Sequence, residues 1–399
     1  MLKGKTVVLA VSGSIAAYKS ANLARRLKKL GADVEVLMTK NATNFIHPIT
    51  FESLTGRKCL VDTFDRNFEF SVEHVALAKR ADAVLLAPAS ANVIGKIAAG
   101  IADDMLTTTI MACTCKTIVA PAMNHNMFHN PIVQDNLCRL RRFGYEIVTP
   151  AHGMLANGDM GDGRMPDEEL LVEYVLREIA CEKDLAGRRV LVTAGPTREA
   201  IDPVRFITNH STGKMGYAVA RAAMYRGAEV TLVSGPVSLE PPPFVERISV
   251  ESAEDMYRVV LECAPEADFI IKTAAVADYR PTETAAEKIK KSDKGLALPL
   301  TRTWDILAAL GKARRPGQVL CGFSMETENA EQNARAKLAK KHVDLIVSNN
   351  LREEGAGFGV DTNRVTIITK EKSEALPLLA KEQVAHVLLD RMRDYAKTV

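Results

Sequence analysis

Small, hydroxyl and amide side chains gather directly after apolar runs in VSGSIAAYK (11–19), APASANVIGK (87–96) and PAMNHNMFHNP (121–131). The first two clusters also precede helical patterns, so each is a strand-to-helix turn. The unpaired N–H groups and the dipole of a first helical turn attract an anion, and the hydroxyl of Ser14 or Ser90 would add a hydrogen bond. Together the two turns could bracket one flat, phosphorylated cofactor.

These residues also have structural interpretations. Pro and Asn favour turns, and Ser90 could cap the helix that starts near Asn92 while still contacting a ligand. The segment DDMLTTT (103–109) offers further hydroxyls such as Thr107, although threonines at such positions more often pack. Because no G-x-G-x-x-G motif is present at residues 11–19, a dinucleotide is not indicated.

Two further features of the first half concern a histidine and a loop. His74, in SVEHVALAKRAD, stands alone, and a lone histidine is more often structural than catalytic. The segment GMLANGDMGDGRMPD (153–167) contains four glycines and no core-forming apolar face, so it is either a lid or a disordered connection. The spacing between His74 and three other histidines of this half is not that of metal ligands; these are His125, His129 and His152.

The second half contains a turn that superficially resembles a P-loop, NHSTGKMG (209–216). The Walker spacing fails, but an amide–hydroxyl–glycine–lysine turn before a helix still suits a phosphate or a carboxylate. TAAVADYRP (273–281) ends another apolar run on small residues and Asp278. The nearby lysines of EKIKK (287–291) would ordinarily be a solvated face, but beside an anion-binding turn they are better explained as neutralising a triphosphate.

The elements that must position these residues alternate along the whole chain. Apolar runs at 6–13, 34–39, 83–90, 117–123 and 145–150 are separated by helical patterns, which predicts a parallel sheet covered on both faces. The pattern starts again in the runs at 189–195, 229–235, 268–278, 319–327, 344–350 and 364–370. We therefore expect an α/β protein with two Rossmann-like domains, residues 1–181 and 189–399, joined by a charged linker over 182–188.

Composition limits the class of protein. The 399 residues are 47% hydrophobic and 25% charged, which suits a soluble globular protein of two or three domains. A net charge of +3 gives no reason to expect nucleic acid or a membrane surface as a partner. The N-terminus lacks a signal-peptide pattern, and seven scattered cysteines without C-x-x-C suit reduced thiols. A cytoplasmic protein is expected.

In combination, SGSIAAYK, the downstream EH, APASAN, PAMNHNMF and the glycine loop ending in GRM resemble phosphopantothenoylcysteine decarboxylase over residues 3 to about 180. The resemblance implies a flavodoxin-like domain that binds FMN. It implies that His74 is the catalytic acid/base and that Asn124 holds the departing carboxylate. It further implies FMN contacts at Gly13, Ser14, Ile15, Thr39, Ser90, Asn92 and Thr107, and substrate contacts at Met127 and Arg164.

One residue departs from that family. Family members oxidise the cysteine thiol carbon, lose CO₂ and reduce the resulting enethiolate, and many use a loop cysteine to protonate it. This chain has Asn157 at that position, and an amide is no practical proton donor. Either another group or water delivers the proton, or the position was altered. If protonation fails, the enethiol product would accumulate after one turnover.

The second half resembles phosphopantothenate–cysteine ligase from about 188 to 395, through DPVRFITNHSTGKMG, AAVADYRP, KIKK and GF-x-x-ET. Within that family CTP activates the pantothenate carboxylate as an acyl-cytidylate, which the cysteine amine then attacks. The resemblance implies that Asn209 stabilises the acyl-cytidylate, that Lys288 serves the second half-reaction, and that Mg²⁺ accompanies CTP. It also implies substrate contacts at Arg205, Ser211 and Lys214, and CTP contacts at Ala275, Asp278, Lys288, Trp304, Asp305, Ile306, Leu307, Phe323, Lys337 and Lys341.

Together the two resemblances predict a bifunctional enzyme of bacterial coenzyme A biosynthesis. Its substrates would be 4′-phosphopantothenate, cysteine and CTP, and its product 4′-phosphopantetheine. They also imply homo-oligomers, with decarboxylase trimers and ligase dimers assembling into a dodecamer. The alternatives are a peptide cysteine decarboxylase or flavin prenyltransferase, which leave the second domain unexplained, and a non-catalytic regulatory relative, which needs neither a CTP site nor His74 with Asn124.

Overall fold

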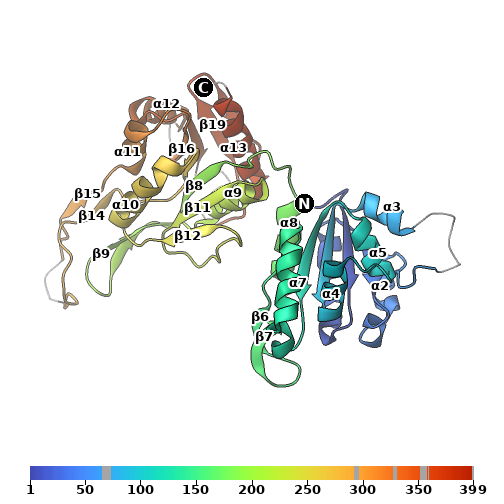
Figure 1. Ribbon diagram of the computed structural model, residues 1–399. Helices are drawn as coiled ribbons and strands as arrows, with labels where there is room; N and C mark the ends of the chain where they lie inside the picture. Colours follow the sequence, from blue (N-terminus) through green and yellow to red (C-terminus); the bar gives the residue numbers. More distant parts are fainter. Residues whose placement is uncertain (65–72, 292–295, 327–329, 351–356, 358, 398–399) are drawn as a thin grey trace. The chain divides into compact units, whose positions relative to one another are not determined.

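The computed structural model describes residues 1–64, 73–291, 296–326, 330–350, 357 and 359–397. The chain divides into two compact units, Met1–Cys181 and Glu182–Val399, called unit 1 and unit 2 (Figure 1). Each unit is built around its own sheet, with helices packed on it. The prediction of an α/β fold with two mainly parallel sheets is confirmed.

Unit 1 contains, within its described residues, a five-stranded parallel sheet of order β2-β1-β3-β4-β5. This is the flavodoxin-like order, in which ligands bind where the strand order reverses, between β1 and β3. The central strands are rich in Val, Leu and Ala and are buried on both faces, because helices cover the sheet on both sides. The strand bounds are β1 Thr6–Val11, β2 Asp33–Met38, β3 Ala83–Ala89, β4 Lys116–Pro121 and β5 Glu146–Ile147.

The helices of unit 1 begin where the sequence places capping residues. The Ser90 hydroxyl accepts a hydrogen bond from Val93 N at the start of α4, and Gly100, with φ of 74°, ends that helix. Asp104 and Thr107 form a capping box at the start of α5. The bounds are η1 Ile15–Tyr18, α1 Lys19–Lys29, η2 Ala42–Asn44, α2 Pro48–Thr55, α3 Glu73–Arg80, α4 Ala91–Ala99, α5 Met105–Ala112, α6 His125–Phe128, α7 Pro131–Arg142 and α8 Glu168–Ile179.

The glycine-rich segment differs from its prediction. It forms an antiparallel hairpin of β6 (Ala151–Met154) and β7 (Met160–Arg164), where the sequence suggested a lid or a disordered connection. The pattern gave no sign of strands because four glycines remove the alternation of apolar side chains. Main-chain hydrogen bonds between its strands define the hairpin instead. A further one, from Met123 N to Gly163 O at 3.0 Å, attaches it to the end of β4.

Unit 2 contains, among the residues described, an eight-stranded sheet of order β12-β11-β8-β13-β16-β17-β19-β20. The first six strands are parallel and follow the 3-2-1-4-5-6 order of a Rossmann fold, with the switch point between β8 and β13. The last two strands are antiparallel. The bounds are β8 Arg189–Ala194, β11 Glu229–Ser234, β12 Glu246–Ser249, β13 Phe269–Lys272, β16 Val319–Glu326, β17 Leu345–Asn350, β19 Val365–Thr369 and β20 Ser373–Ala375.

Helices cover this sheet, and short strand pairs extend from it. Gly216 allows α9 to lie close to the sheet, since a Cβ there would lie 2.5 Å from Thr273 Oγ1 and 2.6 Å from Ala194 Cβ. The helices are α9 Lys214–Tyr225, α10 Ala253–Cys263, η3 Ala264–Glu266, α11 Ile306–Ala313, α12 Ala330–Lys341 and α13 Lys381–Ala396. The pairs are β9 Arg198–Ala200 with β10 Phe206–Thr208, β14 Tyr279–Pro281 with β15 Leu300–Arg302, and β18 Thr362–Asn363 with β21 Leu379–Ala380.

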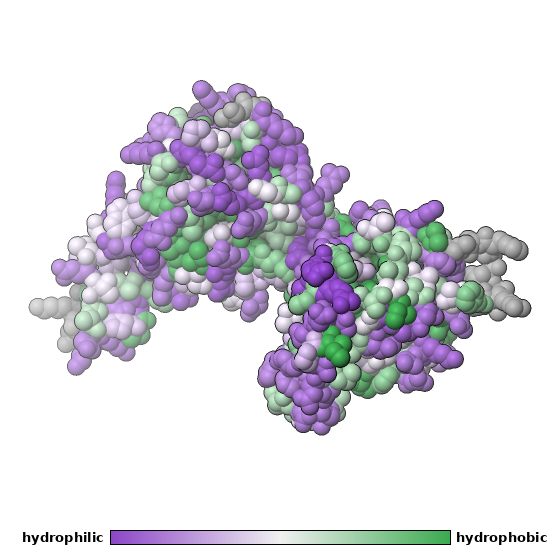
Figure 2. All heavy atoms as spheres, viewed as in Figure 1, coloured by the Kyte–Doolittle hydropathy of each residue, from purple (hydrophilic) through white to green (hydrophobic). Residues whose placement is uncertain are grey.

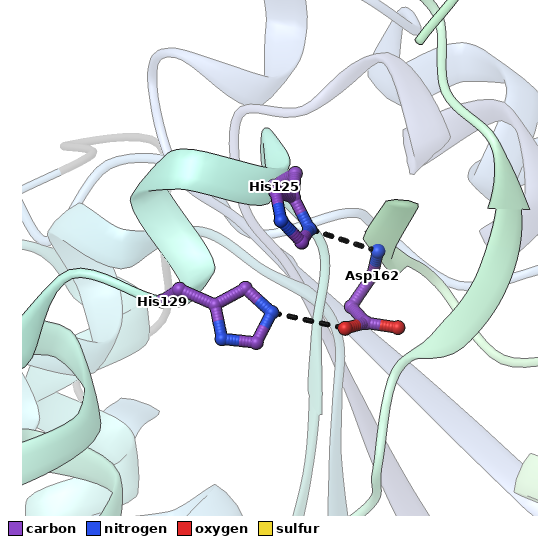
Figure 3. A group of neighbouring side chains, drawn as sticks. All are labelled: His125, His129 and Asp162. Carbon is purple, nitrogen blue, oxygen red and sulfur yellow. Dashed lines mark hydrogen bonds and ion pairs between the residues drawn. The ribbon is translucent and has the colours of Figure 1, made fainter. Parts of the chain in front are cut away.

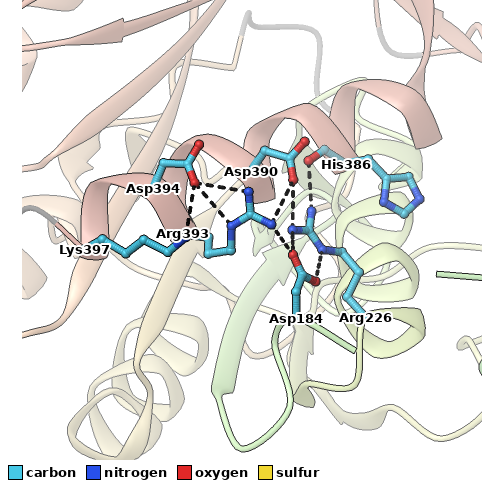
Figure 4. Close-up of polar contacts among 7 residues, drawn as sticks. All are labelled: Asp184, Arg226, His386, Asp390, Arg393, Asp394 and Lys397. Carbon is cyan, nitrogen blue, oxygen red and sulfur yellow. Dashed lines mark hydrogen bonds and ion pairs between the residues drawn. The ribbon is translucent and has the colours of Figure 1, made fainter. Parts of the chain in front are cut away.

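The segment 182–188 is fixed to unit 2. Leu185 is buried, and its N–H donates to Arg226 O at 3.0 Å. The Arg226 guanidinium, itself buried, contacts Asp184 at 2.5 Å and Asp390 at 2.9 Å, and Arg393 of α13 also pairs with Asp184 (Figure 4). These ion pairs tie the start of unit 2 to its last helix.

No helix among the residues described is long and apolar enough to cross a membrane. On the face drawn in Figure 2, polar side chains cover most of the surface of each unit, with apolar side chains in separate patches.

Candidate active sites

Unit 1 contains a cavity of about 780 Å³ at the carboxyl ends of β1, β3 and β4. Its volume suits a small-molecule ligand or cofactor. Residues from all three predicted turns and from the hairpin line it. Of the predicted site residues, the cavity is lined by Gly13, Ser14, Ile15, Thr39, Ser90, Asn92, Asn124, Met127, Asn157 and Arg164.

Hydroxyl groups set the geometry of the two turns that start η1 and α4. Ser14 Oγ accepts from Ala16 N at 3.3 Å, and Ser90 Oγ accepts from Val93 N at 3.5 Å, so both residues cap helices and line the cavity. The buried Ser12 hydroxyl donates to Pro88 O at 2.8 Å and accepts from Ser90 N at 2.8 Å. Ser12 therefore locks the ends of β1 and β3 together.

The end of β4 and the hairpin form the opposite wall. Asn124 caps α6, with Oδ1 accepting from Asn126 N at 2.9 Å. Gly163 has a φ of 121°, and a Cβ there would lie 2.2 Å from Met123 O, so this close approach requires glycine. Asn157, at the tip of the hairpin, donates from Nδ2 to Asp159 Oδ2 at 2.5 Å.

Sequence reasoning missed several lining residues. Lys19 brings a positive charge to the wall of the cavity, and Asn41 brings an amide from the end of β2. Lys19 stands in the SGSIAAYK motif, where its charge beside an anion-binding turn was the available signal. Asn41 follows an apolar run in the same way as Asn124 does. Apolar walls come from Val93, Met123, Met154, Leu155 and Met165.

Two predicted residues do not line this cavity. His74 is partly buried near the start of α3. Thr107 is fully buried, and its hydroxyl lies 2.9 Å from Asp104 Oδ1 in the capping box of α5. The packing role that the sequence offered as the alternative for Thr107 is therefore present in the fold.

Unit 2 has a smaller cavity, of about 140 Å³, at the carboxyl edge of its sheet. Of the predicted residues, Ser211, Lys214, Ala275 and Phe323 line it. Asn209 lies beside it, because its Nδ2 donates to Ala275 O at 2.8 Å. The turn before α9 and the end of β13 thus meet at the Rossmann switch point.

A second lysine, which sequence reasoning did not single out, lies in this cavity. Lys381, at the start of α13, is buried and donates to Gly357 O at 3.0 Å, while Lys214 pairs with Asp361 at 2.7 Å. Burial and then the charge of Lys214 lower the pKa of Lys381 to about 8. Two cations that line one cavity, at the starts of α9 and α13, form a site suited to an anion.

A third lysine, Lys272 at the end of β13, lies among predicted CTP contacts. Its Nζ donates to Ala274 O at 3.1 Å. Burial and then the charge of Lys341 lower the pKa of Lys272 to about 8. Lys341 in turn pairs with Asp305 at 3.1 Å. Lys337, another predicted contact, donates to Ser324 Oγ at 2.9 Å and so reaches a residue that lines the cavity.

Asp202 positions the two predicted residues Arg205 and Lys288. Its fully buried carboxylate lies 3.1 Å from the Arg205 guanidinium and accepts from Ile289 N at 3.1 Å. Arg205 also donates to Ile289 O at 2.6 Å. The exposed Lys288, next in the chain to Ile289, is therefore held beside Arg205.

The remaining predicted CTP positions differ in exposure. Trp304 is exposed and packs against Tyr257, with ring centroids 5.5 Å apart. Ile306 and Leu307 are buried in the core, so only their main chain at the start of α11 remains for a ligand. Asp278 is exposed at the end of its turn. Thr327, the last residue of the GF-x-x-ET motif, lies outside the described residues.

Two family models match the chain. Residues 1–180 match the model described as flavoprotein. Residues 185–395 match the model described as DNA/pantothenate metabolism flavoprotein C-terminal domain.

Curated relatives and solved structures resemble the chain as follows. The coenzyme A biosynthesis bifunctional protein CoaBC of Bacillus subtilis is 47% identical over 401 residues, covering 100% of this chain and 98% of the relative. Its namesake in Vibrio vulnificus is 45% identical over 394 residues, covering 98% of each. A crystal structure of the C-terminal domain of such a protein is 43% identical with a TM-score of 0.47, covering 55% of this chain and 100% of that chain. A PPC decarboxylase mutant complexed with pantothenoylaminoethenethiol is 33% identical with a TM-score of 0.39, covering 43% and 96%.

The sequence relatives span the whole chain, including both units and the segment between them. Their identity far exceeds what a shared fold alone produces, and both family models agree with them in order and extent. The chain therefore belongs to the family of bifunctional coenzyme A biosynthesis proteins, which are enzymes with a decarboxylase (lyase) and a ligase activity.

Proposed function

We propose that unit 2 joins 4′-phosphopantothenate to cysteine at the expense of CTP, and that unit 1 decarboxylates the product to 4′-phosphopantetheine. The family assignment supports this pair of activities. The observation that carries the division of labour is the cavity of unit 1, where Asn124, Asn157 and two serine-capped helix starts converge. We assign a separate anion site to the switch point of unit 2, where Lys214 and Lys381 line the smaller cavity.

FMN fits the donors and walls of the unit 1 cavity. Ser14 and Ser90 offer hydroxyls beside main-chain N–H groups, and Lys19 offers a charge for the phosphate. Apolar residues line the remaining wall and suit a flat ring. When bound, FMN supplies reversible two-electron oxidation.

The chain's own residues orient the substrate. We assign to Asn124 the binding of the carboxylate that leaves as CO₂, because its side chain lines the cavity at the end of β4. Met127 offers an apolar contact for the substrate, and Arg164, which lies 3.6 Å from Asp167, remains exposed enough to bind its phosphate. The hairpin covers one wall and excludes water from the reacting atoms.

His74 requires a second chain in this proposal. It does not line the cavity of its own unit, whereas a catalytic acid/base must reach the reacting atoms. The cavity rim exposes the apolar side chains of Ile15, Tyr18, Met127 and Met154, which is the kind of patch that a partner covers. We therefore propose a homo-oligomer in which a neighbouring copy supplies His74, with decarboxylase trimers and ligase dimers combining into a dodecamer.

In unit 2, the phosphopantothenate carboxylate would attack the α-phosphorus of CTP, forming an acyl-cytidylate and releasing pyrophosphate. The cysteine amine then attacks the acyl carbon, which forms the amide and releases CMP. We assign Asn209 to the acyl-cytidylate, Lys288 to the second step and Lys214 with Lys381 to the phosphates. Mg²⁺ is proposed as the counterion of the triphosphate, because two polyanions cannot otherwise approach closely.

A second outcome for unit 1 is favoured by Asn157. With an amide at this position, decarboxylation would stop at the enethiol, which is two hydrogen atoms lighter than phosphopantetheine. It would do so after one turnover, because the two electrons removed from the substrate would not be returned to it. A cytoplasmic location is also proposed, because the seven cysteines are all free and a reducing compartment keeps them so.

The test incubates the full-length protein with 4′-phosphopantothenate, cysteine, CTP and Mg²⁺, and identifies the products by mass spectrometry. Phosphopantetheine would support the complete proposal, and the enethiol would support the second outcome. Pyrophosphate release without CO₂ loss would restrict function to unit 2. A colourless protein that cannot be reconstituted with FMN and releases no pyrophosphate would overturn the proposal and favour a non-catalytic relative.

A further inference from the structure

Four side chains that the proposed reactions do not use converge beside the unit 1 cavity. His125 opens α6 and His129 follows its last residue, one helical turn later, so both imidazoles lie on the same side. Asp162 comes from β7 and His152 from β6. Figure 3 shows His125 and His129 facing Asp162 across the gap between α6 and the hairpin.

The contacts of this His–Asp cluster are short and specific. His129 Nε2 lies 2.9 Å from Asp162 Oδ2, and His152 Nδ1 lies 3.0 Å from Asp162 Oδ1. His125 Nδ1 accepts from Asp162 N at 3.1 Å, so this imidazole is held against the strand that carries Asp162.

The donor set is that of a transition-metal site. Nitrogen of His125 and His129 and oxygen of Asp162 lie within 4.8 Å of one another. Around a tetrahedral Zn²⁺ with bonds of about 2.0–2.1 Å, neighbouring ligand atoms lie about 3.3 Å apart. Small rotations of three side chains would reach that separation, and the exposure of His129 leaves a path for the ion.

We propose that His125, His129 and Asp162 bind one divalent transition-metal ion of the Zn²⁺ type, and that His152 is a positioning residue that orients the carboxylate. Imidazole and carboxylate together suit Zn²⁺ better than Mg²⁺ or Ca²⁺, which prefer oxygen ligands alone. A hydrogen bond to a ligating carboxylate is the usual support of such a site.

The ion would join two segments that line the cavity. α6 directly follows Asn124, and the hairpin that carries Asp162 also carries Asn157. Metal binding would therefore restrain the hairpin against α6. This inference does not rest on the proposed reactions, because the ligands lie outside the assigned residues.

The test uses full-length protein without a polyhistidine tag. Zn²⁺ is titrated calorimetrically, and Co²⁺ is followed through the visible absorption that distinguishes tetrahedral from octahedral coordination. We expect a single specific site in the wild type. His129→Ala and Asp162→Asn should each weaken Zn²⁺ binding by at least about tenfold to 100-fold. The control His47→Ala removes an exposed histidine of the same unit and should leave the affinity unchanged.

Hydrogen exchange on the wild type gives a readout that needs no variant. Zn²⁺ should slow amide exchange in residues 151–164 and 124–130, and Mg²⁺ at the same concentration should not. Unchanged exchange, or equal Zn²⁺ affinity for Asp162→Asn and the wild type, would overturn the proposal and leave a hydrogen-bonded cluster only.

Discussion

Asn157 lines the unit 1 cavity with an amide, which donates hydrogen bonds but does not release a proton at neutral pH. Its Nδ2 contacts Asp159, so the side chain is oriented along the hairpin tip. If the enethiol intermediate needs a proton from this position, the chemistry stops one step early. In the proposed reaction, the identity of this one residue would then decide which product leaves unit 1.

Replacing this amide with a thiol should restore a proton donor. We expect Asn157→Cys to shift the product from the enethiol to phosphopantetheine, which mass spectrometry separates by two hydrogen atoms. Asn126→Cys is the matched control, because it adds a thiol at a nearby exposed position with no assigned role. If the wild type already makes only phosphopantetheine, water or another group supplies the proton, and the variant gains nothing.

The lysines of unit 2 predict a pH dependence. Burial and then the charge of Lys214 lower the pKa of Lys381 to about 8. In the same way, burial and then the charge of Lys341 lower the pKa of Lys272 to about 8. Both are charged at neutral pH and lose the charge as pH rises through 8. We therefore expect CTP to bind more weakly at pH 9 than at pH 7, measured calorimetrically.

The stability of unit 2 should change with pH in the opposite direction to its affinity for CTP. Between pH 8 and the ordinary lysine value the unfolded chain binds more protons than the folded one, so unfolding of unit 2 should become harder as pH rises. Lys381→Met should flatten both trends, whereas Lys340→Met, on the exposed side of α12, should flatten neither. A pH-independent affinity for CTP in the wild type would contradict the assignment of Lys381.

Individual site residues could be predicted from the sequence where they directly follow the end of a predicted strand. Ser14, Ser90 and Asn124 occupy the first positions after apolar runs, and the parallel sheet brings those ends together. Lys381 was not predictable in this way, because it reaches its cavity from the start of α13, far along the chain. Spacing in the sequence does not predict the His–Asp cluster, because Asp162, which joins its histidines, comes from a separate strand.

Elements with a strong apolar pattern were predicted well, and weak or exposed ones were not. The run at 268–278 was expected to be one strand, but β13 ends at Lys272, and the small residues beyond it form the edge of the cavity. The strand β12 was missed because its residues are mostly exposed and polar. Apolar periodicity arises from buried positions, so it does not predict a strand whose residues are mostly exposed.

The hairpin β6–β7 offers a test at the level of an element. Gly163→Ala forces a Cβ to within 2.2 Å of Met123 O, and its φ of 121° disfavours any L side chain. We expect the hairpin to separate from β4 and FMN retention, measured by absorbance of the purified protein, to fall. Gly158→Ala is the control, because its φ is 86° with nothing near the added Cβ.

The control Gly158→Ala measures only the cost of a left-handed backbone conformation for a residue with a Cβ, which is about 1–2 kcal/mol. If both variants lose FMN equally, hairpin strain rather than its contact with β4 controls the cavity. If neither does, the hairpin is not needed to hold the cofactor.

At the level of the whole molecule, each unit has its own sheet and core, and one ion-pair network holds the segment 182–188 to unit 2. Asp184 pairs with the buried Arg226, so it belongs to unit 2 although it lies in the segment expected to be a linker. The length and composition of 182–188 do not predict this attachment to unit 2, because Arg226 and Asp390 are distant from the segment in the sequence.

Fragments cut at two different places should separate the activities of the two units from the contribution of Asp184 to the stability of unit 2. A fragment 182–399 should release pyrophosphate when given CTP and 4′-phosphopantothenate, and a fragment 1–181 should be yellow after reconstitution with FMN. A fragment 189–399 lacks Asp184 and Leu185, so Arg226 loses one partner. Breaking a buried pair is destabilising by about 3–5 kcal/mol when no partner remains, and Asp390 should reduce the loss. Equal melting temperatures of the two unit 2 fragments would contradict the role of Asp184.

The outer strands of the unit 2 sheet limit how copies of the chain can associate. β12 is four residues long and exposes Glu246 and Arg247, while β20 is three residues long and its Glu374 is held by Arg391 at 2.7 Å. Short, charged borders of this kind resist the addition of another strand. A ligase pair of the proposed kind should therefore join through parts of unit 2 other than these two outer strands, because the residues at such a seam disfavour a continuous sixteen-stranded sheet.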